Sequence, residues 1–519
     1  MTKPETVRAV RAVGAVSAVG AVDVVIAGAG MAAVRLVEQI LAHDVDRRLR
    51  VTVIGAERQP PYNRVLLSAA LTDPRRLDEL VLHERQWYRR QAVELTTATR
   101  VVTIDRAART LHCDDGQARR YDRLVLATGA NPTLPPIRGI VTAKGKLHPS
   151  VTSFRSYDDC RRLLAAAAHA RRVVVVGGGV LGLEAARGLA SRGLGIDVVH
   201  AGPHLLHDHL DADAGELLRR QVEGLGIRVR TGLHVSAVDA DGHRLRAARL
   251  SDGSRIGCDL AVLACGSRPA TRLAVAAGLT TGPGVVVDDQ LRSVDDDLVY
   301  AIGDCATRRD AEPETGQAWA AWAQADVLAR VLLGADARYR GERRAVRLRA
   351  AGLEVAAIGE PMGSASADTE VVRVHNPARG SYKRLAFRHN RLVGGVLVGD
   401  ASGAATLAAA LDRPWLHASP AALLLGAATA SARQPDSAAL ADETTICACN
   451  GVDTARVRAA ARHHAGAGEN NHADTDRIVA AVVDETRATT GCGGCGPLVR
   501  SIVGATLAAV ATPARQPPA

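Results

Sequence analysis

VDVVIAGAGMAA, residues 22–33, has the pattern of an apolar strand that enters a glycine turn and then a helix. Its apolar first half predicts a buried parallel strand, and a helix is predicted over residues 32–43. In such a turn Gly28 permits the tight bend, Gly30 lets the backbone approach a pyrophosphate, and the small Ala33 lets helix and strand pack closely. The amides at the helix N-terminus then receive the anion. The stretch therefore favours a dinucleotide-binding βα unit over an ordinary turn.

The strand predicted next, residues 50–57, ends in an acidic residue, Glu57. Glu57 lies farther from Gly28 than the usual spacing of about 20 residues, but in the same structural slot. Because an acid there hydrogen-bonds the ribose of a dinucleotide, Glu57 is a predicted cofactor-binding residue.

A second glycine loop lies in RVVVVGGGVLG, residues 172–182. Its valines predict a strand that leads into Gly177, Gly179 and Gly182, and a helix is predicted to follow through Leu189. This copy is the stronger signal of the two, and it predicts a second dinucleotide-binding unit.

The strand predicted after the second loop, residues 196–201, ends in His200 and Ala201. A site that prefers NAD usually carries an acid at this position. The sequence therefore does not choose between NADH and NADPH.

Each glycine unit is followed by a further apolar strand. YDRLVLATGANP, residues 121–132, carries Thr128 and Gly129 after its strand, and the parallel segment CDLAVLACGSRP occupies residues 258–269. VYAIGDCA comes later, at residues 299–306. We take these turns as candidate cofactor contacts.

Gly303 and Asp304, inside VYAIGDCA, also fit a turn that caps a helix when they are read alone. The order of all these pieces resembles that of flavoprotein reductases with two dinucleotide-binding folds, in which the nicotinamide domain interrupts the flavin domain and the flavin domain resumes at a GD motif. The resemblance implies that Asp304 meets the ribityl or pyrophosphate part of the flavin.

Four cysteines form two close pairs, Cys447 with Cys449 and Cys492 with Cys495. Each pair holds two sulfurs within reach of one ion or cluster edge, so we expect the four to bind one metal centre. Zinc is the structural alternative, because four cysteines are a usual zinc site. An electron carrier is useful beside a flavin, which favours iron and sulfur, although the cysteine count alone permits two irons or four.

Helices are predicted around the cysteine pairs, over residues 454–463, 475–488 and 497–510. Asp453 or Thr454 is the expected cap of the first helix, and Thr475 that of the second. Both pairs thus precede helix starts, where amide dipoles favour an anionic cluster.

Composition narrows the class of protein. The 519 residues predict three or four domains, and 47% apolar content excludes a disordered chain. No clean apolar run of about 20 residues is present, which argues against a membrane span. The formal charge of +10 is carried by arginines dispersed among acids, and two Phe with seven Tyr leave little for base stacking, so nucleic-acid binding is not expected.

The other cysteines, at positions 113, 160, 258, 265 and 305, contain no close redox pair. We therefore expect reduced thiols, no thiol-disulfide chemistry and a cytoplasmic location. Residues 1–20 have the outline of a secretory signal, but cleavage there would fall at the edge of the first strand. Residues 1–20 fit better as a loosely ordered extension, or as the result of a translation start placed too early.

PPYNRVLLSAAL, residues 60–71, is similar to the segment that flanks the flavin ring in assimilatory nitrite reductase large subunits and in the electron-transfer subunits of bacterial assimilatory nitrate reductases. The resemblance covers nearly the whole chain. It implies that Asn63 and Arg64 contact the flavin and that Glu184 orients the nicotinamide. Related ferredoxin reductases have a lysine where this chain has Ala69.

The cysteine pairs resemble the [2Fe-2S] domain of the bacterioferritin-associated ferredoxin (BFD) type, with a longer spacer. The implied cofactors are FAD, NAD(P)H and a [2Fe-2S] cluster, with no side chain as acid, base or nucleophile. No later cysteine set for sirohaem follows, so the expected acceptor is a separate protein, the catalytic subunit of nitrate reductase. Two alternatives stay open: a ferredoxin- or rubredoxin-type reductase serving an oxygenase, and a non-enzymatic flavin sensor with zinc at the cysteines.

The expected fold is α/β, with two Rossmann-like domains, a small α+β domain containing a hairpin at residues 382–400, and a helical iron–sulfur domain. The expected divisions are an extension at 1–20, an FAD domain at 21–150 and 271–335, an NAD(P)H domain at 151–270, an α+β domain at 336–428, a linker at 429–443 and a BFD-like domain at 444–515.

Overall fold

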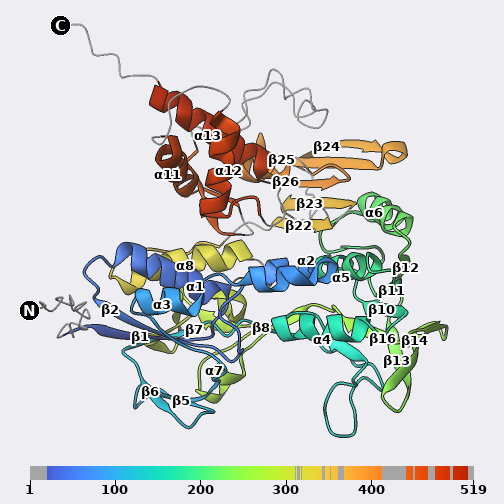
Figure 1. The fold of residues 1–519 in the computed structure, drawn as a ribbon, viewed down its shortest axis with the longest axis horizontal. Coiled ribbons are helices and arrows are strands. Elements are labelled where there is room, and N and C mark those ends of the chain that lie inside the picture. Colours follow the sequence, from blue (N-terminus) through green and yellow to red (C-terminus); the bar gives the residue numbers. More distant parts are fainter. Residues whose placement is uncertain are drawn as a thin grey trace, which may run out of the picture.

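The fold is seen in a computed structural model of the chain (Figure 1). The structure describes residues 20–309, 311, 316, 318–341, 345–350, 352–360, 368–401, 403–411, 440–442, 444–447, 450–465, 474–490 and 495–511. Two sheet-based parts lie at the bottom of the view in Figure 1, and a third sheet with a group of helices lies above them.

In the described chain the first sheet has eight strands, in the order β21-β18-β19-β20-β7-β1-β2-β3. β1 pairs in parallel with β2 and β7, and its apolar side chains are buried. Helices α1 and α8 pack against each other over this core. The elements are β1 (Val22–Ala27), α1 (Met31–His43), β2 (Leu49–Ile54), β3 (Glu94–Thr96), β7 (Arg123–Leu126), β18 (Val285–Val287), β19 (Arg292–Ser293), β20 (Asp296–Ala301), β21 (Ala306–Arg308) and α8 (Ala318–Leu332).

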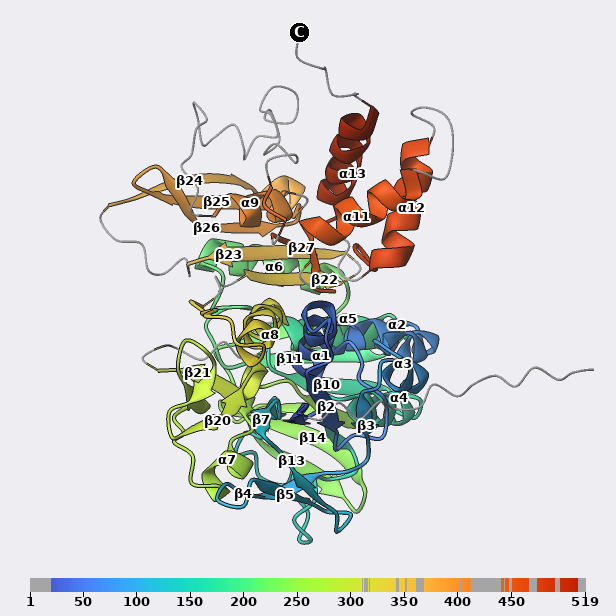
Figure 2. The ribbon, with the colours of Figure 1, turned by 90° about the vertical axis from the view of Figure 1, so that its left-hand side faces the viewer.

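Shorter elements border this sheet and carry the connections. A small antiparallel sheet, β4-β5-β6, lies at its lower side, and β8 pairs with β17 where the chain leaves and re-enters this part (Figure 2). These elements are η1 (Arg64–Leu66), α2 (Leu67–Thr72), η2 (Pro74–Leu80), α3 (Arg85–Arg90), β4 (Val101–Asp105), β5 (Thr110–Cys113), β6 (Ala118–Arg120), β8 (Ala130–Pro132), β17 (Ser267–Pro269), α7 (Arg272–Ala276) and η3 (Gly303–Cys305).

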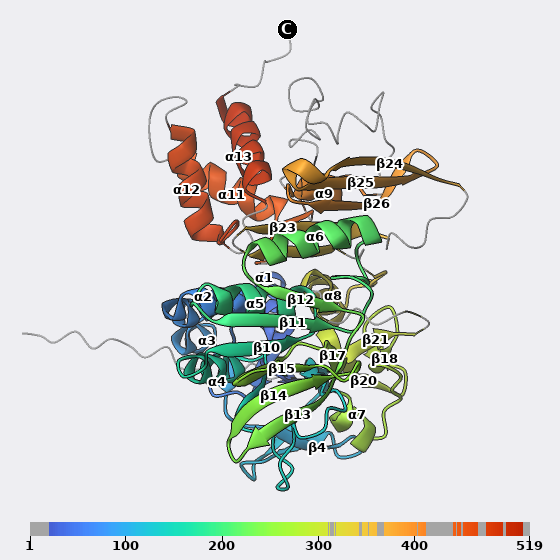
Figure 3. The ribbon, with the colours of Figure 1, turned by 90° about the vertical axis from the view of Figure 1, so that its right-hand side faces the viewer.

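The second sheet is parallel, in the order β12-β11-β10-β16-β9, and the three-stranded sheet β13-β14-β15 packs beside it (Figure 3). Its elements are β9 (Val151–Ser153), α4 (Tyr157–Ala167), β10 (Arg172–Val176), α5 (Val180–Ala190), β11 (Gly195–His200), α6 (Ala212–Gly224), β12 (Arg228–Thr231), β13 (Val235–Asp241), β14 (Arg244–Leu250), β15 (Arg255–Gly257) and β16 (Leu260–Leu263). The sheet therefore sits, in sequence, between two portions of the first sheet.

The third sheet is antiparallel, in the order β22-β23-β26-β25-β24. The predicted hairpin is confirmed, since β25 and β26 pair across His389 and Asn390, whose φ angles of +49° and +57° suit a tight turn. The elements are β22 (Ala345–Ala350), β23 (Leu353–Gly359), β24 (Thr369–Asn376), η5 (Pro377–Arg379), β25 (Ser381–Arg388), β26 (Arg391–Val398) and α9 (Ala404–Ala410).

The C-terminal part has its own buried core of small and branched apolar residues. It consists of β27 (Thr445–Cys447), β28 (Val452–Asp453), α11 (Thr454–Ala465), α12 (Asp474–Thr486) and α13 (Gly496–Ala511). The carboxylate of Asp453 accepts a hydrogen bond of 2.8 Å from the Arg456 amide, so Asp453 is the cap of α11. Thr475 was the wrong choice for α12, because that helix already begins at Asp474.

One predicted boundary near the first glycine loop is wrong. The strand expected at 50–57 ends at Ile54, so Glu57 lies beyond it. A Cβ on Gly55 would stand 2.5 Å from the Cβ of Ala29, and the Gly55 amide donates to the Thr96 carbonyl at 2.8 Å. The chain turns there because it passes close over the glycine loop.

Candidate functional site

One cavity of about 1740 Å³ brings most of the predicted site residues together. The residues that line it come from both glycine loops, from the GD turn and from the cysteine region. The predicted residues among them are Gly28, Gly30, Glu57, Arg64, Thr128, Gly129, Gly179, Glu184, Gly303, Asp304, Cys447 and Cys495. Among the described residues, the predicted Ala33, Asn63, Gly177 and Gly182 do not line it.

The first glycine loop has the shape that a pyrophosphate requires. Gly28 has a φ of +121°, and a Cβ there would lie 2.1 Å from the carbonyl oxygen of Ala127. Gly30 caps α1 with extended backbone, and a Cβ there would meet nothing within 4 Å. Ala33 is fully buried behind the loop. The open space at Gly30 and the amides of α1 thus fit an anionic dinucleotide such as FAD.

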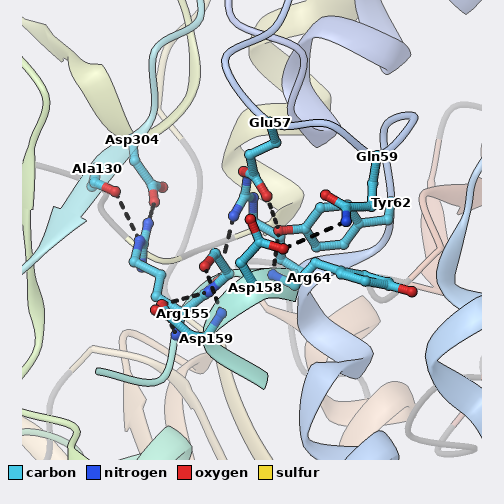
Figure 4. A network of polar contacts seen from close by, with 11 residues as sticks. Glu57, Gln59, Tyr62, Arg64, Ala130, Arg155, Asp158, Asp159 and Asp304 are labelled. Carbon is cyan, nitrogen blue, oxygen red and sulfur yellow. Dashed lines mark hydrogen bonds and ion pairs between the residues drawn. The ribbon is translucent and has the colours of Figure 1, made fainter. Parts of the chain in front are cut away.

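Glu57 belongs to a polar network on the cavity wall (Figure 4). Its carboxylate accepts hydrogen bonds from the Tyr62 hydroxyl at 2.7 Å and from the guanidinium of Arg64. Arg64 also lies 4.9 Å over the Tyr62 ring. Burial raises the pKa of Tyr62, Arg64 opposes the rise and Glu57 adds to it, so this hydroxyl stays a donor. Glu57 and Arg64 therefore face the cavity as a pair.

Asn63 holds the start of η1 and reaches toward the cysteine region. Its side-chain oxygen accepts a bond of 3.0 Å from the Val65 amide, and its side-chain nitrogen donates to Asn450 at 3.0 Å. Only 3% of Asn63 is exposed. Its predicted flavin contact stays a prediction.

Arg155 is a site residue that the sequence did not reveal. Its guanidinium donates to the Asp304 carboxylate at 2.5 Å and to the Ala130 carbonyl at 2.9 Å (Figure 4). Arg155 directly precedes the capping box of α4, formed by Ser156 and Asp159. That box marks a helix start in the sequence, but no local signal shows that the preceding arginine meets an aspartate 149 residues later.

Hydrogen bonds to neighbouring segments fix the GD turn at Gly303 and Asp304. Gly303 has a φ of +73°, and its amide donates to Gln324 at 2.6 Å. Asp304 accepts a second bond, of 2.9 Å, from the Gly316 amide. The Thr128 hydroxyl donates to the Ala270 carbonyl at 3.0 Å. These bonds orient the Asp304 carboxylate on the cavity wall next to the first loop.

The second glycine loop repeats this construction. Gly177 has a φ of +117°, and a Cβ there would lie 2.2 Å from the Ala264 carbonyl oxygen. A Cβ on Gly182 would lie 2.0 Å from the Gly177 oxygen, so helix and strand pack as closely as a third glycine allows. Gly179 caps α5 and opens into the cavity, as Glu184 does. The loop fits a second dinucleotide.

His200 occupies the position of the usual ribose-binding acid. Its Nδ1 accepts a bond of 3.1 Å from the Gly178 amide, and its Nε2 lies 3.0 Å from Nδ1 of His207. Burial lowers the pKa of His200, and His207 lowers it further. His200 is therefore neutral at pH 7 and supports the loop.

The described cysteines of the two pairs lie at the same cavity. Cys447 ends β27, Cys495 directly precedes α13, and their exposed fractions are 2% and 3%. Thiolates beside the start of a helix suit an anionic cluster. Cys449 and Cys492 lie outside the described residues.

The remaining cysteines have the character of buried thiols. Burial raises the pKa of Cys160 and of Cys258 to about 12, and that of Cys265 to about 11. Thiols with such values form little thiolate at pH 7, so they are poor nucleophiles. They do not supply a redox-active pair beside the first loop.

Family models match three successive parts of the chain. The model described as pyridine nucleotide-disulphide oxidoreductase matches residues 22–325. The rubredoxin NAD+ reductase C-terminal domain matches 345–414, and the BFD-like [2Fe-2S] binding domain matches 445–505.

Curated relatives match nearly the whole of this chain. A nitrite reductase of Bacillus subtilis is 33% identical over 93% of this chain and 58% of its own length. The assimilatory nitrate reductase electron transfer subunit of the same organism is 30% identical over 92% of this chain and 59% of its own length. This chain thus spans little more than half of these relatives.

Other reductases match a smaller share of this chain. Rubredoxin-NAD(+) reductase of Pseudomonas putida is 30% identical over 55% of this chain and 72% of its own length. The crystal structure of the ferredoxin reductase for the CYP199A2 system from Rhodopseudomonas palustris has a TM-score of 0.66 and 28% identity, and covers 76% of this chain and 98% of that one.

Proposed function

Because the chain belongs to the pyridine nucleotide-disulphide oxidoreductase family and continues into a BFD-like domain, we propose that it passes electrons from NAD(P)H through FAD and a [2Fe-2S] cluster to a separate acceptor protein. It is an FAD-containing oxidoreductase, and its cofactors are FAD, NAD(P)H and the [2Fe-2S] cluster. The match to the BFD-like domain confirms the iron–sulfur prediction over the zinc alternative.

The observation that carries this proposal is the shared cavity. Both glycine loops, the GD turn, Cys447 and Cys495 open into one space of about 1740 Å³. When bound, FAD supplies the link between carriers, because it takes a hydride from NAD(P)H as two electrons and a proton, gives the electrons singly to ferric iron and returns the proton to solvent.

The chain's own residues contribute orientation and charge. The proposed FAD site is built from Gly28, Gly30, Ala33, Glu57, Asn63, Arg64, Thr128, Gly129, Gly303 and Asp304, the NAD(P)H site from Gly177, Gly179, Gly182 and Glu184, and the cluster site from Cys447, Cys449, Cys492 and Cys495. Ala33, Gly177 and Gly182 shape the loops from outside the cavity. Loop amides bind the pyrophosphates, and the Arg155–Asp304 pair fixes a carboxylate at the flavin side. Catalysis here depends on alignment, with no acid, base or nucleophile required.

The proposed acceptor is the catalytic subunit of an assimilatory nitrate reductase. The relative that bears the name of an electron transfer subunit supports this choice, since it matches across both the reductase part and the BFD-like part. A second candidate is a reductase that serves an oxygenase, which the rubredoxin reductase C-terminal match and the ferredoxin reductase structure favour.

We also propose a cytoplasmic location, supported by the described thiols at positions 113, 160, 258, 265 and 305, which are free. Within the described part of the chain, no helix is both long and apolar enough to span a membrane.

A cysteine variant tests the order of transfer. Cys492→Ala should keep reduction of the flavin by NAD(P)H and lose electron transfer to purified nitrate reductase, while Cys258→Ala, which lies far from the pairs in sequence, should keep both. Transfer at the wild-type rate in Cys492→Ala would exclude the cluster from the route. Transfer by the wild type to an oxygenase ferredoxin but not to nitrate reductase would favour the second candidate.

A further inference from the structure

The loop that follows Cys449 is held against the first sheet's helices by three kinds of contact. Residues 450–453 connect the first cysteine pair to α11, and their partners lie on α1, on α8 and before η1. In Figure 1 the C-terminal helices stand above α1 and α8, and Figure 2 again shows them above α1. This loop is therefore one of the places where the two parts meet.

Arg35 of α1 is the charged contact. Only 4% of Arg35 is exposed, and its guanidinium donates to both carboxylate oxygens of Asp326, at 2.6 and 2.9 Å. Its remaining nitrogen donates to the Gly451 carbonyl at 3.3 Å, and the Asp453 carboxylate lies 4.0 Å away. The Glu38 carboxylate lies 3.9 Å away. Because a buried guanidinium is costly without hydrogen-bond acceptors, its bonds to Asp326 and Gly451 tie the loop to α1 and α8.

Trp322 of α8 is the apolar contact. Gly451 has a φ of +61°, and a Cβ there would lie 3.1–3.5 Å from the indole ring. The backbone thus lies so close to the ring that an added Cβ would force the loop or the ring to shift by a few tenths of an ångström. Trp322 itself is 5% exposed.

Amide contacts complete the set. Asn450 accepts from Asn63 at 3.0 Å and donates to the Arg487 carbonyl at 2.6 Å. The Arg487 guanidinium in turn donates to the carbonyls of Val81 and Glu79, at 3.3 and 3.2 Å. The loop is thus tied on one side to the segment around η1 and η2, and on the other to the end of α12.

We propose that Arg35 and Trp322 are positioning residues, which clamp residues 450–453 and so fix the cluster's distance from the flavin. The inference rests on the proposed function. Cys447 lines the same cavity as Arg64. Gly451, which Arg35 and Trp322 contact, lies two residues after Cys449 in the sequence. Because electron transfer weakens steeply with distance, loosening the clamp slows transfer to the cluster and leaves flavin reduction unchanged. Neither Arg35 nor Trp322 lines the cavity.

Two variants weaken the clamp, one by a change on α1 and the other by a change in the loop. Arg35→Gln removes the charge on α1, and Gly451→Ala pushes the loop off the Trp322 ring. The control for Arg35→Gln is Arg50→Gln, because Arg50 is an exposed arginine in β2 of the first sheet. The control for the second is Gly242→Ala, where φ is +58° and a Cβ would meet nothing within 4 Å, so the backbone strain is matched without the ring contact.

The measurements use the full chain with its cofactors. Stopped-flow absorbance follows flavin bleaching and cluster reduction after mixing with NAD(P)H, and hydrogen exchange follows the amides of α11. Both clamp variants should bleach the flavin at the wild-type rate, reduce the cluster about tenfold more slowly, and lose amide protection in α11. The cluster's midpoint potential should stay unchanged, which separates position from driving force. The two controls should match the wild type.

Wild-type cluster reduction in Gly451→Ala, or unchanged exchange in α11 of both variants, would overturn the clamp. If Arg35→Gln does not fold, Gly451→Ala decides. A wild-type protein whose cluster never accepts electrons from NAD(P)H would instead overturn the proposed function, and the exchange measurement would still decide whether the contacts hold the loop.

Discussion

Gly182 sits at the closest approach within the second glycine loop. In Gly182→Ala the new methyl group would stand 2.0 Å from the Gly177 oxygen, a backbone atom that cannot move aside as the end of a flexible side chain can. We expect a loss of about 1–3 kcal/mol in the stability of this part and weaker NAD(P)H binding, with FAD retained. Thermal unfolding and NAD(P)H titration measure the two effects. Gly224→Ala, where a Cβ meets nothing within 4 Å, is the control. Wild-type affinity in Gly182→Ala would contradict this description of the loop.

His200 predicts a pH effect with a definite sign. Its pKa in the folded protein is lowered from 6.5 by burial and by His207. The unfolded chain therefore binds a proton first, so stability falls as the pH drops below 6.5, by at most about 1.4 kcal/mol per pH unit. His200→Asn should flatten the melting temperature between pH 6.5 and the lower folded pKa, whereas the exposed His169→Asn should not. Parallel pH profiles for wild type and His200→Asn would refute the assignment.

At the scale of elements, local sequence patterns predicted the strands and helices closest to the glycine loops. β1 is Val22–Ala27 and β10 is Arg172–Val176, as expected, because apolar runs before glycines leave few other structures. The end of β2 was missed, since it depends on how Gly55 passes Ala29. The sequence also could not predict contacts between distant segments. Arg155 meets Asp304, and Arg35 meets Gly451, only because tertiary packing brings these segments together.

Asp211 joins two elements, because it caps α6 and binds the third sheet. It accepts from the Ala214 amide at 3.0 Å, from the Tyr382 hydroxyl at 2.5 Å and from Arg384 at 2.7 Å. Asp211→Ala should cost about 2 kcal/mol, seen as a lower melting temperature. Asp213→Ala, which removes an exposed ion pair with Arg373, should change little. Equal effects of the two variants would show that Asp211 does not join these elements.

Asp211 also makes the stability of the fold depend on pH in acid. Burial raises the pKa of Asp211, but Tyr382, the Ala214 amide and Arg384 lower it more, so the folded value lies below 3.8. This contribution to stability is present above pH 3.8 and disappears as the pH falls through the folded value. The melting temperature of Asp211→Ala should therefore approach that of the wild type in strong acid.

At the scale of the whole molecule, four packed parts surround one cavity. The glycine loops predicted two dinucleotides and the cysteine pairs one metal centre, and the family resemblance implied that these carriers are FAD, NAD(P)H and a [2Fe-2S] cluster. Their meeting at one cavity depends on the order of the sheets and on the docking of the C-terminal helices, which the structure supplies. The sequence alone could not show whether the cysteine pairs lie beside the glycine loops, so it could not test the alternative of an isolated zinc site.

The most direct test of the account is an anaerobic NAD(P)H titration of the wild-type protein, produced with ample iron and followed by flavin absorbance and electron paramagnetic resonance. We expect a [2Fe-2S] cluster on the chain, flavin bleaching, and a reduced-cluster signal that grows with added NAD(P)H. A protein that holds no iron, or a flavin that is fully reduced while the cluster stays oxidised, would contradict it.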